Sequence, residues 1–547
     1  MKNTRNITAR SLAARLLAVV LAITVAALPG CRAAQGGADG TALPSPTPSA
    51  TAEPAPGGRL YMPIGENTVI EDPYAVNTEE AMGLYSLVFE GLVRVDYAHI
   101  ISPCLAENWS VDETGRIWTL NLRQNVSWHQ SSKALDAQDV KYTWDRLKEA
   151  GEESYYYYHA QKIQDVVVID ADTVQVIMKR PGISALYSLT FPILCAEGGG
   201  ANMRGTGPYQ VSSSVPNRIE LTANERWWRS APYIKEVIFE GRVNNETALA
   251  SYQAGQLNFV PTDLRTAGKY REEGVSNVLD VMTQQAELLV VNYETAALGN
   301  VNVRKAIAYA IDRGELVSNV YMNRAQTVDV PIAPDSWLYE SKSKVYDYDP
   351  AAALELMKEA GWVDSDGDGI LESVDSPYTE LTLKLLVNET ADNTARSEAA
   401  AIIAGHLGEI GVKVAIESAA FTLGDDESGY IQRLNSGDFD MALIGLNLPR
   451  DCDFTPLMGK NGVNNFGGYS NAAMDILIQN MVTAATDSDF RDAASTFQLQ
   501  FIEELPFIML YFRLNSIVYS DDIQGVGNVR EPELFYSIEK WYMKSGQ

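Results

Sequence analysis

The clearest hydrophobic pattern in the chain is a strict alternation between residues 118 and 123. A period of two is typical of a strand that buries one face. The preceding residues 112–115, Asp-Glu-Thr-Gly, favour a turn, so we predict a β-hairpin over residues 108–123. The inward positions are Trp118, Leu120 and Leu122, and the outward positions are Thr119, Asn121 and Arg123.

Further patterns predict a mixed order of helices and strands. Asp136 can cap a helix whose apolar face carries Val140, Trp144 and Leu147. The alternation of strand and helix between residues 381 and 444 predicts a βαβ-type sheet with parallel strands. The predicted strands are 59–64, 173–179, 288–292, 381–387, 412–416, 439–444 and 505–511, and the predicted helices include 303–313, 349–362 and 395–410.

The N-terminal segment is typical of an exported protein. Residues 1–30 combine a basic start with a short apolar run, which favours a signal peptide over a permanent membrane helix. The run ends at Cys31, in a sequence that resembles the lipobox of bacterial lipoproteins, so we expect lipidation of Cys31; plain secretion is the alternative. Residues 32–58 contain no aromatic residue, and with Cys31 they are predicted to form a lipidated, disordered tether.

Composition narrows the classes of partner. The chain has 547 residues, which favours two or three lobes. It carries 71 acidic against 43 basic side chains, for a formal charge of −28. Such a surface repels nucleic acid and anionic membranes. Three cysteines remain beyond Cys31, so at most one disulfide can form, and buried free thiols are favoured.

Several motifs together resemble one known family. Residues 103–123 read PCLAENWSVDETGRIWTLNLR, and residues 139–147 read DVKYTWDRL. With the FEGL, GTGPY and VRKAIAYAIDR segments, they resemble the family 5 extracellular solute-binding proteins, which include peptide- and nickel-binding receptors of bacterial import systems. The resemblance covers almost all of residues 59–547. The glycines of GTGPY belong to a turn and not to a phosphate site, because no Lys-Ser/Thr pair follows them.

The resemblance implies a mixed α/β fold of the bilobal, type II periplasmic-binding-protein kind, with an extra inserted domain and a hinge between the lobes. Lobe I would comprise residues 59–88, 189–287 and 508–547. The inserted domain would span residues 89–188, and lobe II residues 288–507. The ligand would lie between the lobes.

The resemblance also implies ligand-binding residues. In oligopeptide and dipeptide receptors, the segment after residues 439–445 carries a tryptophan and then an aspartate that pairs with the amine of the ligand. Here Leu446 stands where the tryptophan is expected, Asp451 follows two residues later than the expected aspartate, and Asp453 is the alternative. Leu443 replaces an arginine that some oligopeptide receptors have. The other family positions expected near the pocket are Asn77, Asn388 and Phe421.

Two clusters have competing interpretations. Tyr155, Tyr156, Tyr157 and Tyr158 lie where the family places the mouth of the cleft, and they either contact ligand or pack alternately into the core. Asp364, Asp366 and Asp368 match the start of a calcium-binding loop, with Asp375 at its twelfth position. A solvated, glycine-rich turn is the favoured interpretation of that loop.

Catalysis is not expected. The four histidines, at positions 99, 129, 159 and 406, have no metal-like spacing, and no GxSxG or HExxH motif occurs. No cofactor is expected. We therefore predict an extracytoplasmic, membrane-anchored, monomeric receptor that binds peptides and delivers them to the permease of an ABC importer. A receptor for an oligosaccharide or a nickel chelate, and a surface adhesin or sensor with the same fold, remain alternatives.

Overall fold

The structure is a computed structural model that describes residues 54–75, 78–152, 154–197, 204–389, 394–422 and 428–544. All of them belong to one compact unit, residues 52–547. The predicted signal peptide, Cys31 and Asn77 lie outside the described residues. Within those residues, no helix combines the length and the apolar character needed to cross a membrane.

The first sheet confirms the strand predicted at residue 59. Its strand order is β1 (Arg59–Gly65), β10 (Glu236–Arg242), β9 (Arg218–Ala223) and β8 (Tyr209–Val215). β1 pairs with β10 in parallel, and the other pairs are antiparallel. Leu60 and Met62 of β1 are buried in the core that also includes Leu84 and Leu87 of helix α1 (Glu79–Val88).

The predicted hairpin lies in a second four-stranded sheet. Its order is β4 (Ala106–Val111), β5 (Ile117–Leu122), β7 (Thr173–Met178) and β6 (Ile163–Val168), with every pair antiparallel. Trp118 and Leu120 of β5 are buried, whereas Asn121 is exposed. Trp118 and Leu120 lie opposite Val176 and Val174 of β7, respectively, which are also buried. The alternation in the sequence therefore separates a core face from a solvent face, as predicted.

Helix α2 (Ala137–Leu147) begins at the predicted cap. The Asp136 carboxylate accepts the backbone N–H groups of Gln138 and Asp139 at 2.9 and 3.1 Å. The Asp139 carboxylate accepts the Asp136 N–H in return, which completes a capping box. The predicted apolar face is buried and comprises Val140, Trp144 and Leu147. Helix α3 (Tyr157–Lys162) follows in the chain.

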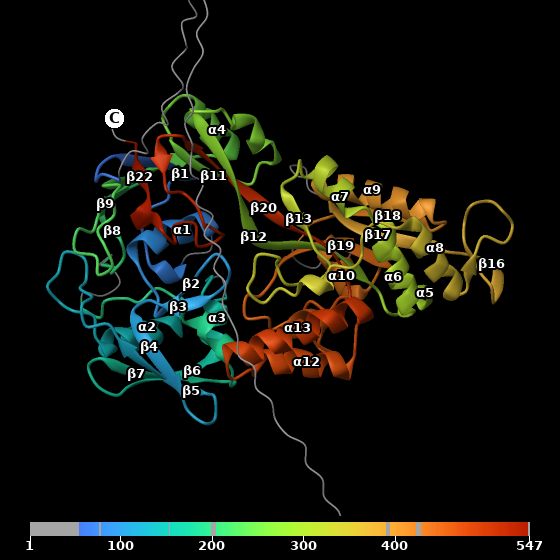
Figure 1. Cartoon of the computed structure of the whole chain (residues 1–547), viewed down its shortest axis with the longest axis horizontal. Coiled ribbons are helices and arrows are strands. Elements are labelled where there is room, and N and C mark those ends of the chain that lie inside the picture. The colour runs from blue at the N-terminus through green and yellow to red at the C-terminus, as the bar shows by residue number, and fades with distance from the viewer. Residues whose placement is uncertain are drawn as a thin grey trace, which may run out of the picture. The chain divides into compact units, whose positions relative to one another are not determined.

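A seven-stranded sheet contains the predicted parallel unit. Its order is β11 (Phe259–Thr262), β20 (Ile508–Ser520), β12 (Ser276–Val291), β19 (Met441–Asn447), β17 (Thr382–Glu389) and β18 (Lys413–Ala420), and β13 (Ala325–Thr327) also pairs with β20. β17 pairs in parallel with both β18 and β19, and helix α9 (Ala395–Glu409) joins β17 to β18. The two long strands β12 and β20 run antiparallel, side by side (Figure 1).

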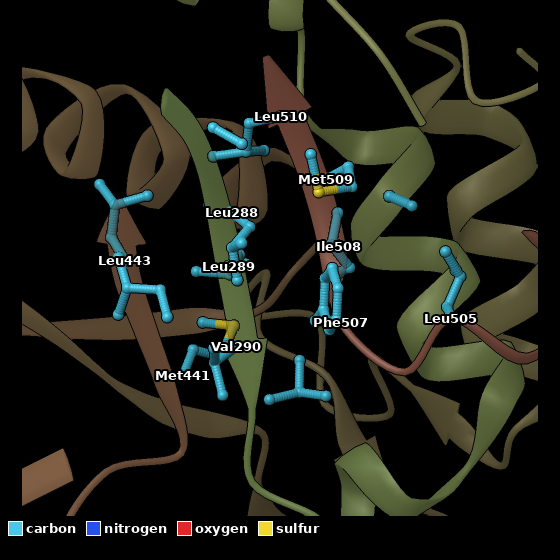
Figure 2. Close-up of a cluster of buried hydrophobic side chains, with 14 of the residues drawn as sticks. Leu288, Leu289, Val290, Met441, Leu443, Leu505, Phe507, Ile508, Met509 and Leu510 are labelled. Carbon is cyan, nitrogen blue, oxygen red and sulfur yellow. The ribbon is translucent and has the colours of Figure 1, made fainter. Parts of the chain in front are cut away.

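The apolar run of β12 is a buried strand, as predicted. Leu288, Leu289, Val290 and Val291 are at most 6% exposed. Figure 2 shows this run between β19 on one side and β20 on the other, with Leu443 and Ile508 among the flanking side chains. Leu443 is 0% exposed and lies opposite Leu289. The residue that stands where some oligopeptide receptors have an arginine is therefore part of the hydrophobic core.

The helix predicted at residues 303–313 ends three residues early. Helix α6 (Val301–Ala310) stops there because Asp312 begins a new turn. The Asp312 carboxylate accepts the backbone N–H of Glu315 at 3.0 Å and caps α7 (Arg313–Glu315). A residue that looked like part of one helix thus serves as the cap of the next.

The helix predicted at residues 349–362 is also shorter. Asp349 is the cap of α8 (Pro350–Glu359), and its carboxylate accepts the N–H of Ala352 at 3.0 Å. Gly361 follows with φ +83°, a left-handed conformation that ends the helix.

The other elements are α4 (Asn245–Gln253), α5 (Ala296–Gly299), α10 (Tyr430–Ser436), α11 (Thr455–Met458), α12 (Ala472–Val482), α13 (Asp487–Glu504), β2 (Val93–Val95), β3 (Ile101–Pro103), β14 (Trp362–Val363), β15 (Glu372–Ser373), β16 (Ser376–Glu380), β21 (Ile523–Gln524) and β22 (Tyr542–Met543).

The described cysteines confirm the favoured interpretation. Cys104, Cys195 and Cys452 are all buried free thiols. The fold of the described residues therefore depends on packing and hydrogen bonding and not on a disulfide.

Candidate functional site

A cavity of about 300 Å³ collects side chains from distant parts of the chain. It is lined by the stretches 82–95, 155–162, 187–192, 227–229, 449–451 and 532–539 and by the single residues Cys104, Pro208 and Gln284. A larger groove, of about 1180 Å³, runs past Tyr61, Tyr252 and Tyr270, but it includes none of the residues predicted to bind ligand. The smaller cavity includes four of them and is therefore the candidate site.

Asp451 lines this cavity in the loop after β19. Its side chain is 8% exposed, and its carboxylate is paired with the ammonium of Lys162, at the end of α3. It also accepts the backbone N–H of Asp453 at 3.3 Å. Burial lowers the pKa of Lys162, the charge of Asp453 raises it, and Arg180 lowers it further. The predicted ammonium-binding carboxylate thus already holds an ammonium that belongs to the protein.

Asp453, the alternative to Asp451, lies outside the cavity lining. Its carboxylate is 3.4 Å from the guanidinium of Arg180, whose side chain is 58% exposed. It also caps the turn that follows, accepting the backbone N–H of Thr455 at 3.2 Å. Of the two aspartates, the geometry favours Asp451 as the ligand-binding group.

The four consecutive tyrosines divide between the core and the cavity. Tyr156 is 7% exposed and packs edge-on against Tyr74, with ring centroids 5.8 Å apart. Tyr155 and Tyr158 are 38% and 71% exposed, and they line the cavity together with Tyr156. Tyr157 does not line the cavity; its hydroxyl donates to Glu152 at 3.4 Å. Tyr156 therefore packs into the core, and contact of the exposed Tyr155 and Tyr158 with ligand stays a prediction.

Three other predicted residues do not reach the cavity. The side-chain oxygen of Asn388 accepts a hydrogen bond from Arg396 at 2.7 Å, and Arg396 also pairs with buried Glu287. Phe421 is 50% exposed. Leu446 packs against the main hydrophobic core. Nothing in the geometry of these side chains supports a ligand contact.

Glu90 is a buried acid that sequence reasoning missed. Its carboxylate accepts hydrogen bonds from the Trp228 indole and the Thr206 hydroxyl, both at 2.9 Å. Burial raises the pKa of Glu90 to about 7, against the lowering effect of these hydrogen bonds. The available signal was an acidic residue inside the apolar run Val88-Phe89-Glu90-Gly91-Leu92.

Two arginines on the cavity wall were also missed. Arg94 follows buried Val93 on β2, so the alternation of the strand turns it away from the core. Its guanidinium lies 4.0 Å from the centre of the Tyr536 ring. Arg229 stacks on Trp228 at 4.5 Å. Neither arginine makes an ion pair within the part of the chain that the structure describes.

The remaining charged groups of the wall include a bonded pair and a neutral imidazole. Arg450 donates to the Glu533 carboxylate through both terminal guanidinium nitrogens, and the bond from Nη2 is 2.8 Å long. Burial and the charge of Lys162 lower the pKa of His159 to about 4. His159 is therefore neutral near pH 7, and one of its ring nitrogens lies 3.2 Å from the carbonyl oxygen of Ser188.

The predicted calcium loop joins β14 to β15 and gathers four carboxylates. Asp364, Asp366, Asp368 and Glu372 have oxygen atoms that all lie within 4.8 Å of one another. Glu372, and not Asp375, completes the group. The loop is also held by its own hydrogen bonds, such as that from the N–H of Gly367 to Asp364 at 2.7 Å. The solvated turn stays the favoured prediction, with calcium binding as its alternative.

Comparison with known proteins agrees with the resemblance seen in the motifs. The profile of the bacterial extracellular solute-binding proteins, family 5 Middle, matches residues 101–465. The oligopeptide-binding protein AppA of Bacillus subtilis (strain 168) is 26% identical, over 96% of this chain and 97% of its own length. The nickel-binding periplasmic protein of Escherichia coli (strain K12) is 23% identical, over 66% of this chain and 71% of its own. A solved structure of the periplasmic murein tripeptide-binding protein MppA, in its unliganded open form, matches with a TM-score of 0.76 at 19% identity, covering 91% of this chain and 99% of that one.

Proposed function

Because the chain belongs to family 5 of the bacterial extracellular solute-binding proteins, we propose that it is the receptor of an ABC importer and that its ligands are peptides. The receptor holds its ligand in the 300 Å³ cavity and passes it to a membrane permease. It binds the solute without changing it chemically.

The observation that carries this proposal is the pairing of Asp451 with an ammonium inside the cavity. Lys162 presents to that carboxylate the same kind of charged group that a peptide presents at its amino terminus. A buried carboxylate needs such a partner. The free ligand amine can therefore take the place of the lysine. Tyr155 and Tyr158 add exposed aromatic surface and hydroxyl groups beside it.

Native mass spectrometry of the protein purified from its own cells tests the ligand class directly. A bound mass that fragments as a peptide is the expected result. A bound oligosaccharide or metal chelate would overturn the proposal. Isothermal titration calorimetry with the identified peptide and its N-acetylated form then tests whether the free amine is recognised.

We also propose that the mature protein is a lipid-anchored monomer outside the cytoplasm. The sequence pattern around Cys31 supports this anchor. Substitution of Cys31 by serine should abolish incorporation of labelled fatty acid and release the protein into the soluble fraction. Retention of the label in that variant would contradict the proposed anchor.

The proposed lobes and hinge are supported by the strand pairing. β12 and β20 pair continuously from Ser276 to Met282, and the register then shifts before Ala286. This irregularity lies close to the boundary predicted between residues 287 and 288. Long strands with a local break in register offer a place where two lobes can rotate.

Ligand binding should therefore close the protein. Because a ligand contacts both lobes only in the closed state, it shifts the population toward that state. Small-angle X-ray scattering should show a smaller radius of gyration once the identified ligand saturates the protein. An unchanged scattering curve at proven saturation would contradict closure.

A further inference from the structure

A second, much smaller cavity lies beside the candidate site. Its volume is about 20 Å³, which is enough for one water molecule or one ion of similar size. It shares only Gln284, Pro449 and Arg450 with the wall of the larger cavity. The rest of its wall is mainly apolar and includes Ala333 and Phe512.

Two buried nitrogen atoms of residues on this wall have no hydrogen-bond partner. They are the Nε of Arg530, a residue that is 1% exposed, and the Nε2 of His99, which is 8% exposed. Because a buried polar group without a partner costs free energy, two such atoms indicate a bound polar particle. The other nitrogens of Arg530 are used, since Nη1 pairs with Asp335 and Nη2 donates to the carbonyl oxygen of Thr283 at 3.3 Å. The Nε–H is therefore available to a particle in the cavity.

The side chains of this wall offer hydrogen-bond donors more than acceptors. Arg530 and Arg450 can only donate. The Gln284 amide satisfies its neighbours when its oxygen accepts from Nη2 of Arg450 at 2.8 Å, so that oxygen is not free. Among the described residues, no aspartate or glutamate lines this cavity. A water molecule has two hydrogens to donate, whereas a halide ion only accepts, so these side chains suit the ion better.

The electrostatic potential in the small cavity also favours an anion. Burial lowers the pKa of His99 well below its ordinary value, and the charges of Arg530 and Arg450 lower it further. The same charges that oppose a proton on His99 attract a negative ion beside it. The carboxylates that pair with these arginines, Asp335 and Glu533, do not line the cavity. An anion there would therefore face the guanidinium groups and not their counterions.

We propose that this cavity binds a single chloride ion, which accepts the Nε–H of Arg530 and the Nε2–H of His99. The ion joins distant parts of the chain: His99 lies between β2 and β3, Arg530 follows β21, and Ala333 lies in the loop after β13. Gln284 lies in β12 at the shift of its register with β20, so the ion lies beside the proposed hinge. The site fills whatever the ligand of the larger cavity is.

Crystals grown with bromide in place of chloride test the site directly, because bromide scatters X-rays anomalously. One anomalous peak should lie in the cavity, within hydrogen-bonding distance of Arg530 and His99. In solution, chloride should raise the midpoint of thermal unfolding relative to gluconate at the same ionic strength. Gluconate is too large for the cavity, whereas an ion that binds only the folded protein stabilises it. The rise should follow the logarithm of the chloride concentration.

Two variants test whether the chloride effect arises in this cavity. Ala333→Val adds two methyl groups to the wall and should remove the chloride dependence. His99→Asn suits the φ of +65° at this position, but its side chain is too short to replace Nε2. It should need about tenfold more chloride for the same rise, because a hydrogen bond to a charged group is lost. Ala325→Val is the matched control and should keep the dependence, because Ala325 belongs to the same hydrophobic core as Ala333 but does not line the cavity.

Three outcomes would overturn the chloride site. Equal unfolding midpoints in chloride and gluconate would show that the cavity holds water. A bromide peak in the crystal without a chloride dependence in solution would show binding at crystal concentration only. A chloride dependence that persists in Ala333→Val would place the ion elsewhere on the protein. Each of these outcomes leaves the proposed peptide function intact, because none of the measurements involves a peptide.

Discussion

Replacing Asp451 with asparagine should weaken binding of a peptide with a free amino terminus by at least about 30-fold. Loss of one partner from a buried, hydrogen-bonded charge pair costs about 2–5 kcal/mol. The side chain of Asp451 is only 8% exposed, so water compensates little for the missing carboxylate. Calorimetry with a free peptide and its N-acetylated form should show that the variant no longer distinguishes the two.

Removing the charge of Lys162 should change the affinity in the opposite direction. If the ligand amine replaces the Lys162 ammonium at Asp451, the lysine competes with the ligand. Lys162→Met keeps most of the aliphatic side chain and removes the charge, so it should strengthen binding of a free peptide by roughly tenfold. The double variant Lys162→Met/Asp451→Asn should lose that gain, because the two substitutions act on one pair.

Asp453→Asn is the control for the Asp451 variant. Asp453 pairs with exposed Arg180 outside the cavity lining. Exposed ion pairs contribute about 0.2–1 kcal/mol, so affinity should change by less than about fivefold. Full amine recognition in Asp451→Asn would refute the amine clamp. Weaker binding in Lys162→Met would show that the lysine contacts the ligand and does not compete with it.

The fold was predictable where a short stretch of sequence determines the local structure by itself. The alternation around Trp118 predicted a hairpin because side chains on a strand point to opposite faces. Asp136 predicted the start of a helix because its carboxylate can reach the N–H groups that the first turn leaves free. The predicted ends failed at Asp312 and Gly361, where a second cap and a left-handed glycine interrupt a pattern that continues in the sequence.

The candidate site was much less predictable, because it is built from distant parts of the chain. Asp451 could be proposed only from the family resemblance, and its partner Lys162 lies 289 residues away. Periodicity says nothing about such a pair. Arg94 and Arg229 look like ordinary surface arginines in the sequence, and only the structure shows that they line one cavity and form no ion pair within the described residues.

The ligand contacts at Asn388 and Leu446 stay predictions, and neither side chain lines the cavity. A position inherited from a family fixes a place on a strand, but the surrounding side chains decide what it contacts. Asn388 is bonded by Arg396, and Leu446 packs against the main core. The cavity wall is therefore formed by stretches of the chain other than these two positions.

Glu90→Gln should make the protein more stable at pH 8 than the unmodified chain, by about 3 kcal/mol, and leave its stability at pH 4 nearly unchanged. The pKa of Glu90 is raised from 4.5 to about 7 in the folded state. Its contribution to stability is therefore fully present below pH 4.5 and is lost as the pH rises through about 7. A difference of about 2.5 pKa units corresponds to about 3 kcal/mol.

The measurement is the free energy of unfolding from chemical denaturation between pH 4 and pH 8, taken as the difference between the variant and the unmodified protein. Repulsion among the many other acidic groups also changes the free energy of unfolding over this pH range. It does so equally in both proteins, so the difference removes its effect. Glutamine can still accept the hydrogen bond from Trp228, and the hydroxyl of Thr206 can rotate to accept from the new amide. Glu225→Gln is the control, because the side chain of Glu225 is 64% exposed, and its difference should stay flat with pH. Parallel stability curves for Glu90→Gln and the unmodified protein would show that Glu90 is ionised at neutral pH, with its charge balanced by a group on the cavity wall.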